Sequence, residues 1–238
     1  MTETIVALDV GSALEAERLV DRLPGLTWVK VGSILMTREG PGLVQRLTGR
    51  GLRVFLDLKW HDIPNTVAGA VTAARDLGVT MATVHSLGGP GMLEAAARAG
   101  EGTVALVGVT VLTSHDGASY DRAVGRQATD LDAEVLRLAR MVGDAGLQGV
   151  VCSPREAGPV RRALGPGPFV VVPGIRRSSD AAGDQVRTAT PEAAVASGAT
   201  HLVVGRPILE SADPAAAYAA IVAEAASRGG GEAVPGAV

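Results

Sequence analysis

A lysine flanked by acidic residues is the feature of this sequence with the clearest chemical meaning. Lys59 lies within Asp57-Leu58-Lys59-Trp60-His61-Asp62, so a carboxylate stands on either side of it. Lys30 is the only other lysine, and the remaining 20 of the 22 basic residues are arginine. Lysine is a compact charge that can give up its proton, whereas arginine is broad, planar and permanently protonated. Chance must place two lysines somewhere, but these acidic neighbours favour an active site that uses the charge or the proton of Lys59.

Charged residues stand at the ends of three apolar stretches that have the composition of β-strands. The first stretch ends in Asp9, the second in Lys30, and the third in both Asp57 and Lys59. Side chains two residues apart on a strand share a face, so we expect Asp57 and Lys59 to point the same way. Each charge would be costly to bury alone, whereas opposite charges can be buried as a paired network. We therefore expect these residues to converge in an active site; a purely structural ion network is the alternative.

Short β-branched stretches alternate with alanine-rich stretches along the chain. The predicted strands are Thr4–Asp9, Thr27–Val31, Arg53–Lys59, Met81–His85, Val104–Val111, Gly149–Cys152, Phe169–Val172 and His201–Val204. The predicted helices between them include Leu14–Leu23, Thr66–Leu77, Met92–Ala99, Leu131–Ala145 and Glu192–Ala196. The strands are continuous apolar runs, which is typical of parallel strands that are buried on both faces.

Eight strand–helix units in one chain predict an α/β fold, a single (β/α)8 TIM barrel, with an open doubly wound sheet as the alternative. The first strand runs into Asp9-Val10-Gly11-Ser12 and lacks the Gly-x-Gly-x-x-Gly turn of a dinucleotide-binding sheet. We therefore predict one catalytic barrel domain over residues 1–228, with its active site at the carboxyl ends of the strands. Residues 229–238 are rich in Gly, Ala and Pro, and we expect them to be a disordered tail.

The overall composition argues against several classes of partner. The net charge is −3 and no basic block is present, which argues against nucleic acid. No apolar run reaches the roughly 18 residues of a membrane span, so we expect no membrane segment. The start, Met1-Thr2-Glu3-Thr4-Ile5-Val6, lacks the basic region of a signal peptide. The lone cysteine, Cys152, excludes an intramolecular disulfide; it fits a cytoplasmic location and buried packing better than a nucleophile.

Glycine and arginine at the ends of the last two strands have the character of a phosphate site. Gly205-Arg206-Pro207 combines backbone that can approach an anion, a helix start and a bidentate donor. Gly174 and Arg176 follow the seventh strand and would form a second wall, since phosphate sites of barrels use the loops after strands seven and eight. The polar segment Arg176–Thr190 is too long for a simple connector and is a candidate lid. A variable surface loop is the competing interpretation.

Asp62 and the histidines have less decisive surroundings. Asp62 precedes Ile63-Pro64, so it is either the cap of a helix that starts with proline or a catalytic residue, and the sequence leaves both open. His61, His85 and His201 do not have the spacing of metal ligands, and no metal site is predicted. His201 opens a strand at the amino end of the barrel, where a structural role is expected.

The segment from Asp57 to Thr66, Asp57-Leu58-Lys59-Trp60-His61-Asp62-Ile63-Pro64-Asn65-Thr66, closely resembles the signature of the orotidine 5′-phosphate decarboxylase family, in its bacterial form. Weaker matches follow in the family's order across nearly the whole chain: Ala7-Leu8-Asp9, Val29-Lys30-Val31-Gly32, Val109-Thr110-Val111-Leu112-Thr113-Ser114, Pro173-Gly174-Ile175-Arg176 and Val203-Val204-Gly205-Arg206-Pro207. Trp60 stands where phenylalanine is expected, and it keeps the position aromatic.

This resemblance implies decarboxylation of orotidine 5′-phosphate to uridine 5′-phosphate without any cofactor, the last step of pyrimidine nucleotide synthesis. Loss of carbon dioxide leaves an electron pair at C6 of the pyrimidine. Lys59 would stabilise and then protonate this carbanion, and Asp57 would lie near the substrate carboxylate and hold Lys59. Whether repulsion by Asp57 outweighs stabilisation of the transition state is left open by the sequence. Lys30 and Asp9 would bind the ribose hydroxyls and complete the network.

The resemblance also assigns the rest of the site. Thr113 and Ser114 would border the pyrimidine, while Gln185, Gly205 and Arg206 would bind the phosphate, with Arg176 beside them. The family residues that match Asp62 and Thr66 enter the site of the neighbouring subunit. A homodimer with shared active sites is therefore implied, and this moves the interpretation of Asp62 from cap towards catalyst.

Three other functions compete with this one. Metal-dependent relatives, such as ketogulonate-phosphate decarboxylase or hexulose-phosphate synthase, share the Asp-x-Lys-x-x-Asp motif but use a magnesium-stabilised enediolate. Their enediolate mechanism needs a further carboxylate near the metal, whereas the second strand of this chain ends in Lys30, which would repel a cation. A lyase that forms a Schiff base with Lys59 is the second alternative. A non-catalytic sugar-phosphate sensor is the third, although a sensor has no need of carboxylates against a lysine.

Overall fold

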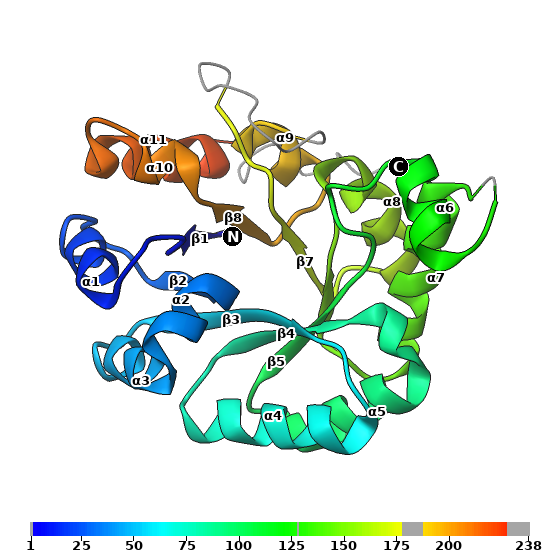
Figure 1. Cartoon of the computed structure of the whole chain (residues 1–238). Coiled ribbons are helices and arrows are strands. Elements are labelled where there is room, and N and C mark those ends of the chain that lie inside the picture. Colours follow the sequence, from blue (N-terminus) through cyan, green and yellow to red (C-terminus); the bar gives the residue numbers. More distant parts are fainter. Residues whose placement is uncertain (1, 128, 178–187, 228–238) are drawn as a thin grey trace, which may run out of the picture.

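The strands form a closed parallel barrel in which each strand pairs with its neighbours in sequence and β8 returns to β1. A computed structural model describes residues 2–127, 129–177 and 188–227. In it the strands lie at the centre and the helices surround them (Figure 1). The strands are β1 (Glu3–Ala7), β2 (Trp28–Gly32), β3 (Arg53–Trp60), β4 (Met81–His85), β5 (Ala105–Val109), β6 (Gly149–Val151), β7 (Phe169–Val172) and β8 (His201–Val204). The predicted TIM barrel is confirmed, and the open-sheet alternative is wrong.

Helices connect successive strands on the outside of the barrel. They are α1 (Ala13–Asp21), α2 (Ser33–Glu39), α3 (Pro41–Gly49), α4 (Pro64–Asp76), α5 (Gly89–Gly100), α6 (Gly117–Val124), α7 (Leu131–Asp144), α8 (Pro154–Leu164), α9 (Pro191–Ala196), α10 (Arg206–Leu209) and α11 (Pro214–Ala226), with a 3-10 turn at Ser86–Gly88. Several start with proline at the first turn, where its missing N–H leaves no hydrogen bond unmade. None of the helices in the described ranges is long and apolar enough to span a bilayer.

The core consists of two apolar layers separated by the sheet. The larger layer lies between strands and helices and includes Val29, Val54 and Ala82. The smaller layer fills the barrel interior and consists of Ile5, Ala7, Trp28, Phe55, Met81, Val107, Val171 and Val203. Alternate residues of one strand therefore contact different layers, which explains why the strands are apolar without interruption.

Strand boundaries differ slightly from those expected. β1 ends at Ala7 and β5 at Val109, each two residues earlier than predicted, so Asp9 follows its strand rather than closing it. The elements of the barrel run from Glu3 to Ala226, and the expected tail at 229–238 lies outside the described residues.

Candidate active site

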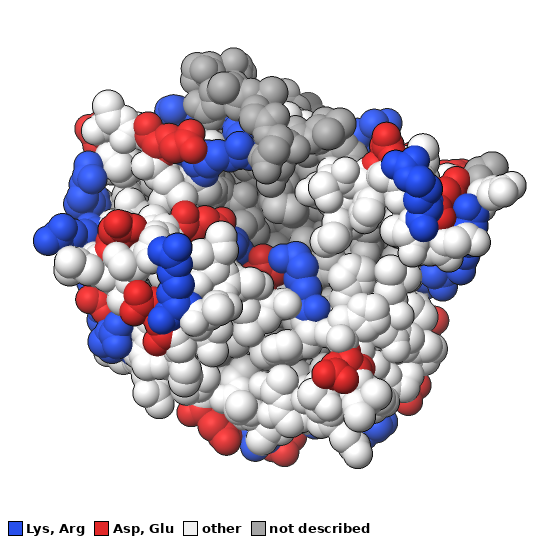
Figure 2. All heavy atoms as spheres, viewed as in Figure 1, with Lys and Arg blue, Asp and Glu red and all other residues white. Residues whose placement is uncertain are grey.

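A cavity of about 650 Å³ opens at the carboxyl ends of the strands. Its lining includes most of the residues predicted from the sequence, namely Asp9, Lys30, Asp57, Lys59, Thr113, Gly174, Arg176, Gly205 and Arg206. Glu210 is the other polar lining residue among those the structure describes, and the apolar lining includes Ala7, Phe55, Val151 and Val203. In the space-filling view, acidic and basic side chains meet beside a hollow near the middle of the face shown (Figure 2).

The predicted charge network is present at one side of this cavity. Lys30 Nζ donates to Asp9 Oδ1 at 2.9 Å and lies 3.8 Å from Asp57 Oδ2. Lys59 Nζ donates to the other carboxylate oxygen of the same residue, Asp57 Oδ1, at 2.8 Å. The Lys30 side chain is 10% exposed and that of Lys59 is 38% exposed. Lys30 is thus largely enclosed by its carboxylate partners, whereas Lys59 keeps a face open to a ligand.

Lys59 reaches Asp57 for a different reason from the one expected. Strands β3 and β4 pair regularly through Leu56 and Ala82, but the next pair is Trp60 and Val84, so the register shifts between them. Within this shift Lys59 has a φ of 53°, in the left-handed region that non-glycine residues rarely adopt. Simple alternation along a strand therefore does not explain why the two side chains meet. A bulge turns the lysine back towards the carboxylate.

Two histidine side chains, His61 and His85, lie near Lys59. His85 ends β4, and its ring stacks on that of His61 with centroids 5.6 Å apart. Burial lowers the pKa of His85 to about 4, and the charges of His61 and Lys59 act in the same direction. His85 is therefore neutral at neutral pH and adds no second positive charge beside the Lys59 ammonium.

The opposite side of the cavity carries the glycine and arginine residues predicted to bind phosphate. Gly174 follows β7 with a φ of 79°, a conformation that glycine adopts without strain. The backbone of Arg176 donates to Ala189 O at 2.9 Å, which closes this wall of the cavity. Gly205 directly precedes α10, and Arg206 is the first residue of that helix. The charge network and the two arginines therefore face one cavity from different strands.

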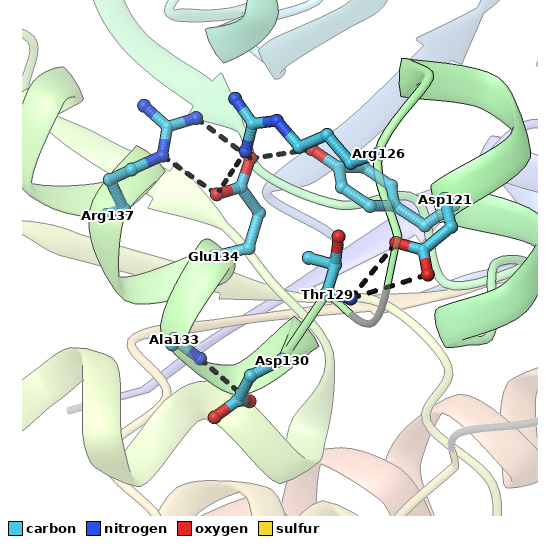
Figure 3. Close-up of polar contacts among 8 residues, drawn as sticks. Asp121, Arg126, Thr129, Asp130, Ala133, Glu134 and Arg137 are labelled. Carbon is cyan, nitrogen blue, oxygen red and sulfur yellow. Dashed lines mark hydrogen bonds and ion pairs between the residues drawn. The ribbon is translucent and has the colours of Figure 1, made fainter.

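A third wall comes from the segment between β5 and α7, which contains Thr113. This segment includes α6, and α6 is joined to α7 through the buried carboxylate of Glu134 (Figure 3). Glu134 accepts hydrogen bonds from Arg137 at 2.8 Å and from the Tyr120 hydroxyl at 2.8 Å. The hydrogen bonds from Arg137 are the main cause that lowers the pKa of Glu134 to about 2. The carboxylate stays ionised and fixes α6, whereas Ser114 is exposed and does not line the cavity.

Asp62 and Thr66 lie outside this cavity. They line a separate, smaller depression of about 330 Å³ together with Lys59 and His61. Asp62 Oδ1 accepts a hydrogen bond from the N–H of Ile63 at 2.7 Å, but Ile63 occupies the cap position of α4 and makes no side-chain cap. The cap interpretation of Asp62 is therefore wrong. Asp62 and Thr66 are exposed, and the Ile63 side chain between them is 67% exposed.

Thr83 is a polar residue of the site that the sequence analysis did not identify. Its hydroxyl accepts the backbone N–H of Lys59 at 2.8 Å and donates to Asp57 Oδ1 at 3.1 Å. The available signal was its position two residues after Met81, on the inward face of β4, since Met81 belongs to the interior layer. Gln185 and most of the candidate lid lie outside the described residues. Within the described ranges, no cluster of three or more His, Cys, Asp or Glu is arranged to hold a metal ion.

Comparisons with known proteins agree with this arrangement. A family model described as "Orotidine 5'-phosphate decarboxylase / HUMPS family" matches residues 2–221. The orotidine 5′-phosphate decarboxylase of Halorhodospira halophila is 56% identical over 94% of this chain and 96% of its own length. That of Alkalilimnicola ehrlichii is 51% identical over the same shares. The crystal structure of the Lactobacillus acidophilus orotidine 5′-phosphate decarboxylase superimposes with a TM-score of 0.83, at 36% identity over 94% of this chain and 99% of that one.

These matches extend over nearly the entire barrel and include the strand ends where the charge network lies. The resemblance found in the segment Asp57–Thr66 is therefore confirmed over the length of the chain, which belongs to the orotidine 5′-phosphate decarboxylase / HUMPS family.

Proposed function

We propose that this protein is an orotidine 5′-phosphate decarboxylase, a carboxy-lyase that releases carbon dioxide and forms uridine 5′-phosphate. The shared name of the relatives and the family match support the activity. The observation that carries the proposal most directly is the Lys59 ammonium, held 2.8 Å from Asp57 in a cavity that also contains arginine side chains. A phosphate, a sugar and a reacting base each have complementary groups within this one cavity.

The proposed reaction uses Lys59 as both electrostatic partner and acid. The bond between C6 and the carboxylate breaks, carbon dioxide leaves, and the electron pair remains on C6. The Lys59 ammonium stabilises this charge as it forms, and one of its protons then moves to C6. The lysine is left neutral and regains a proton from water. Asp57 accepts a hydrogen bond from Lys59 and thereby orients its Nζ.

The other groups would orient the substrate rather than react with it. Arg206 and Gly205, with Arg176 beside them, would bind the phosphate, because a guanidinium offers parallel donors to phosphate oxygens. Asp9 and Lys30 would bind the ribose hydroxyls from the opposite side of the cavity. Thr113 would border the pyrimidine. Binding energy at the phosphate can then be used to align C6 with Lys59.

The decisive measurement is the ultraviolet absorbance of orotidine 5′-phosphate mixed with the purified protein. We expect the spectrum to change to that of uridine 5′-phosphate, and an unchanging spectrum would discard the proposal. Exhaustive chelation should leave the rate unaltered. Loss of activity with chelator and recovery with magnesium would instead favour the metal-dependent branch of the family. Borohydride added with substrate should trap no adduct on Lys59, whereas a covalent adduct would indicate Schiff-base chemistry.

We further propose that the enzyme is a homodimer in which Asp62 and Thr66 of each subunit contribute to the active site of the other subunit. Both residues are exposed and lie outside the cavity of their own chain, beside the exposed Ile63. An apolar side chain of this size between two polar ones suits a surface that another subunit covers. Asp62 would then complete the partner's cavity next to Lys59 of that partner.

Two inactive variants should rescue each other if the sites are shared. A hybrid of Lys59→Ala and Asp62→Ala subunits has one site with both defects and one intact site. Random reassembly makes about half of the dimers hybrid, so activity should recover to roughly a quarter of wild type. Each variant must be inactive alone, and mass measurement of tagged chains verifies the exchange. Verified hybrids that stay inactive would place Asp62 in the site of its own subunit.

The cytoplasm is the compartment we propose. Cys152 is buried and is the single cysteine of the sequence, so it forms no intramolecular disulfide, which fits a reducing environment. The net charge of −3 and the absence of a basic block in the sequence support a small-molecule substrate rather than a nucleic acid.

A further inference from the structure

The bulge in β3 leaves one residue of β4 opposite three residues, two of which belong to the charge network. Leu56 pairs with Ala82 and Trp60 pairs with Val84, so Thr83 alone faces Asp57, Leu58 and Lys59. A regular parallel ladder would place equal numbers of residues on both strands. The extra residues cannot all use the ladder for their backbone hydrogen bonds, and each buried N–H needs another partner.

Lys59 finds that partner in a side chain. Its N–H donates to Thr83 Oγ1 at 2.8 Å, and its φ of 53° is one of two positive φ values at non-glycine residues in the described ranges. Left-handed backbone is unfavourable for a residue with a Cβ, so it persists only where surrounding contacts hold it. The Thr83 hydroxyl is such a contact, because it accepts the N–H of Lys59 within the bulge.

The same hydroxyl also binds the carboxylate that orients the lysine. Thr83 Oγ1 donates to Asp57 Oδ1 at 3.1 Å, and that oxygen also accepts from Lys59 Nζ at 2.8 Å. A hydroxyl has one proton to donate and lone pairs to accept, so both bonds can exist together. Lys59 is therefore fixed at two points, at its backbone by Thr83 and at its ammonium by Asp57. Thr83 joins these two points.

Thr83 is suited to positioning and not to contact with the substrate. Its side chain is fully buried, and it is not among the residues that line the cavity. A β-branched side chain has few rotamers, so its Oγ1 has a well-defined place. Serine would offer the same hydroxyl with more freedom. Valine has the same shape and lacks the hydroxyl.

We propose that Thr83 is a positioning residue of the decarboxylase, which holds the Lys59 backbone in its left-handed conformation and the Asp57 carboxylate in its orientation. This inference rests on the proposed function for the role of Lys59. It predicts that the hydroxyl of Thr83 affects the rate of the chemical step and not the binding of phosphate, because Gly205 and Arg206 line the opposite side of the cavity.

Thr83→Val should lower kcat on the order of 10²-fold, since small displacements of a reacting group have effects of this size. The KM and the dissociation constant of uridine 5′-phosphate should stay close to wild type. Thr83→Ser should recover most of kcat. The matched control is Thr200→Val at the amino end of β8, where the hydroxyl accepts the N–H of Val170 at 3.0 Å and donates to its carbonyl at 3.2 Å. This control should lose stability but keep kcat.

Amide hydrogen exchange provides a readout that does not depend on turnover. The Lys59 N–H should exchange faster in Thr83→Val than in wild type and should stay protected in Thr83→Ser. Wild-type kcat and unchanged exchange in Thr83→Val would overturn the inference, as would a Thr83→Ser variant as slow as Thr83→Val or a Thr200→Val control that loses equal activity. If wild-type protein shows no turnover, the proposed function fails, while the exchange of Lys59 still decides whether Thr83 anchors its backbone.

Discussion

The two ends of the barrel use the same inward-facing positions for opposite purposes. On β2, Trp28 points into the interior layer at the amino end, and Lys30, two residues later, lies in the charge network. On β3 the interior residue Phe55, which pairs with Lys30, is likewise followed two residues later by a charged residue, Asp57. Both strands therefore change from apolar to charged within one step of their alternation. The apolar end excludes water and supports the fold, which allows the other end to gather charges that stabilise it little.

Aromatic side chains fill the barrel interior at its amino end. Trp28 meets His201 edge to face with centroids 5.4 Å apart, and Phe169 meets the same histidine at 4.9 Å. The Arg53 guanidinium lies 4.8 Å from the Trp28 ring and covers it from the solvent side. Because this end is closed and apolar, its substitutions should change stability. Substitutions at the open end should change rate.

The largest expected effect is at Lys59. Lys59→Ala should lower kcat by at least about 10⁴-fold, because both the proton and the adjacent charge are lost. The thermal midpoint should change little, since the lysine is partly exposed and outside the apolar core. Lys59→Arg should be nearly as inactive, because guanidinium is bulkier and a far poorer acid. Steady-state kinetics and thermal unfolding measure both quantities, and robust activity in the arginine variant would refute the role of Lys59 as proton donor.

The next largest effect is expected at the opposite end. Trp28→Ala should destabilise the fold by about 3–5 kcal/mol, because it empties a large buried volume beneath the cavity. At temperatures where the variant is folded, kcat should be close to wild type. Trp28→Phe is the control: among the described residues Trp28 Nε1 has no hydrogen-bond partner, so phenylalanine loses packing without breaking a bond. Denaturant unfolding tests this difference, and equal losses in both variants would contradict it.

The sequence was sufficient for the parts of the molecule that follow a simple period. Eight apolar runs separated by helical stretches predicted the barrel. Asp9, Lys30 and Asp57 were correctly predicted to lie in the cavity because they stand at the ends of the first three strands. Gly205 and Arg206 could be predicted for the same reason, because they directly follow a strand. Local chemistry at a strand end is enough when the fold determines where that end lies.

The bulge could not be predicted in this way. Nothing in the composition of Asp57–Lys59 indicates that β3 gains residues relative to β4, and the position of Lys59 depends on that register shift. The spacing of Thr83 from Met81 places it on the inward face of β4, but its hydrogen bond to the Lys59 N–H depends on the same register shift and leaves no trace in a residue pattern. The exposed position of Ser114 likewise depends on how the segment before α6 turns.

The free energy of unfolding should decrease at low pH because of His201, the buried histidine at the amino end of the barrel. Burial lowers the pKa of His201 to about 4, whereas an unfolded histidine has a pKa near 6.5. The folded state favours the neutral ring, so its contribution is complete above about pH 6.5 and decreases as the pH falls towards 4. The loss should reach up to about 3 kcal/mol. Urea unfolding between these pH values should show a smaller loss in His201→Phe, which keeps an aromatic ring; His85 at the other end still titrates in this variant.

The smallest of these effects is expected at Arg206, and it tests whether charge at the open end acts on rate. Arg206→Ala should lower kcat/KM. The decrease should correspond to a loss of roughly 1.5–3 kcal/mol in transition-state binding free energy, the usual value of a hydrogen bond to a charged group. Its matched control is Arg53→Ala, which removes the same charge at the closed end, 4.8 Å from the Trp28 ring. The control should alter stability slightly and leave kcat/KM unchanged, because Arg53 does not line the cavity. If both variants lose kcat/KM equally, the arginines act through the overall charge of the protein. If Arg206→Ala retains the wild-type value, the phosphate binds elsewhere, and the proposed division of the barrel into a stabilising end and a reacting end does not include Arg206.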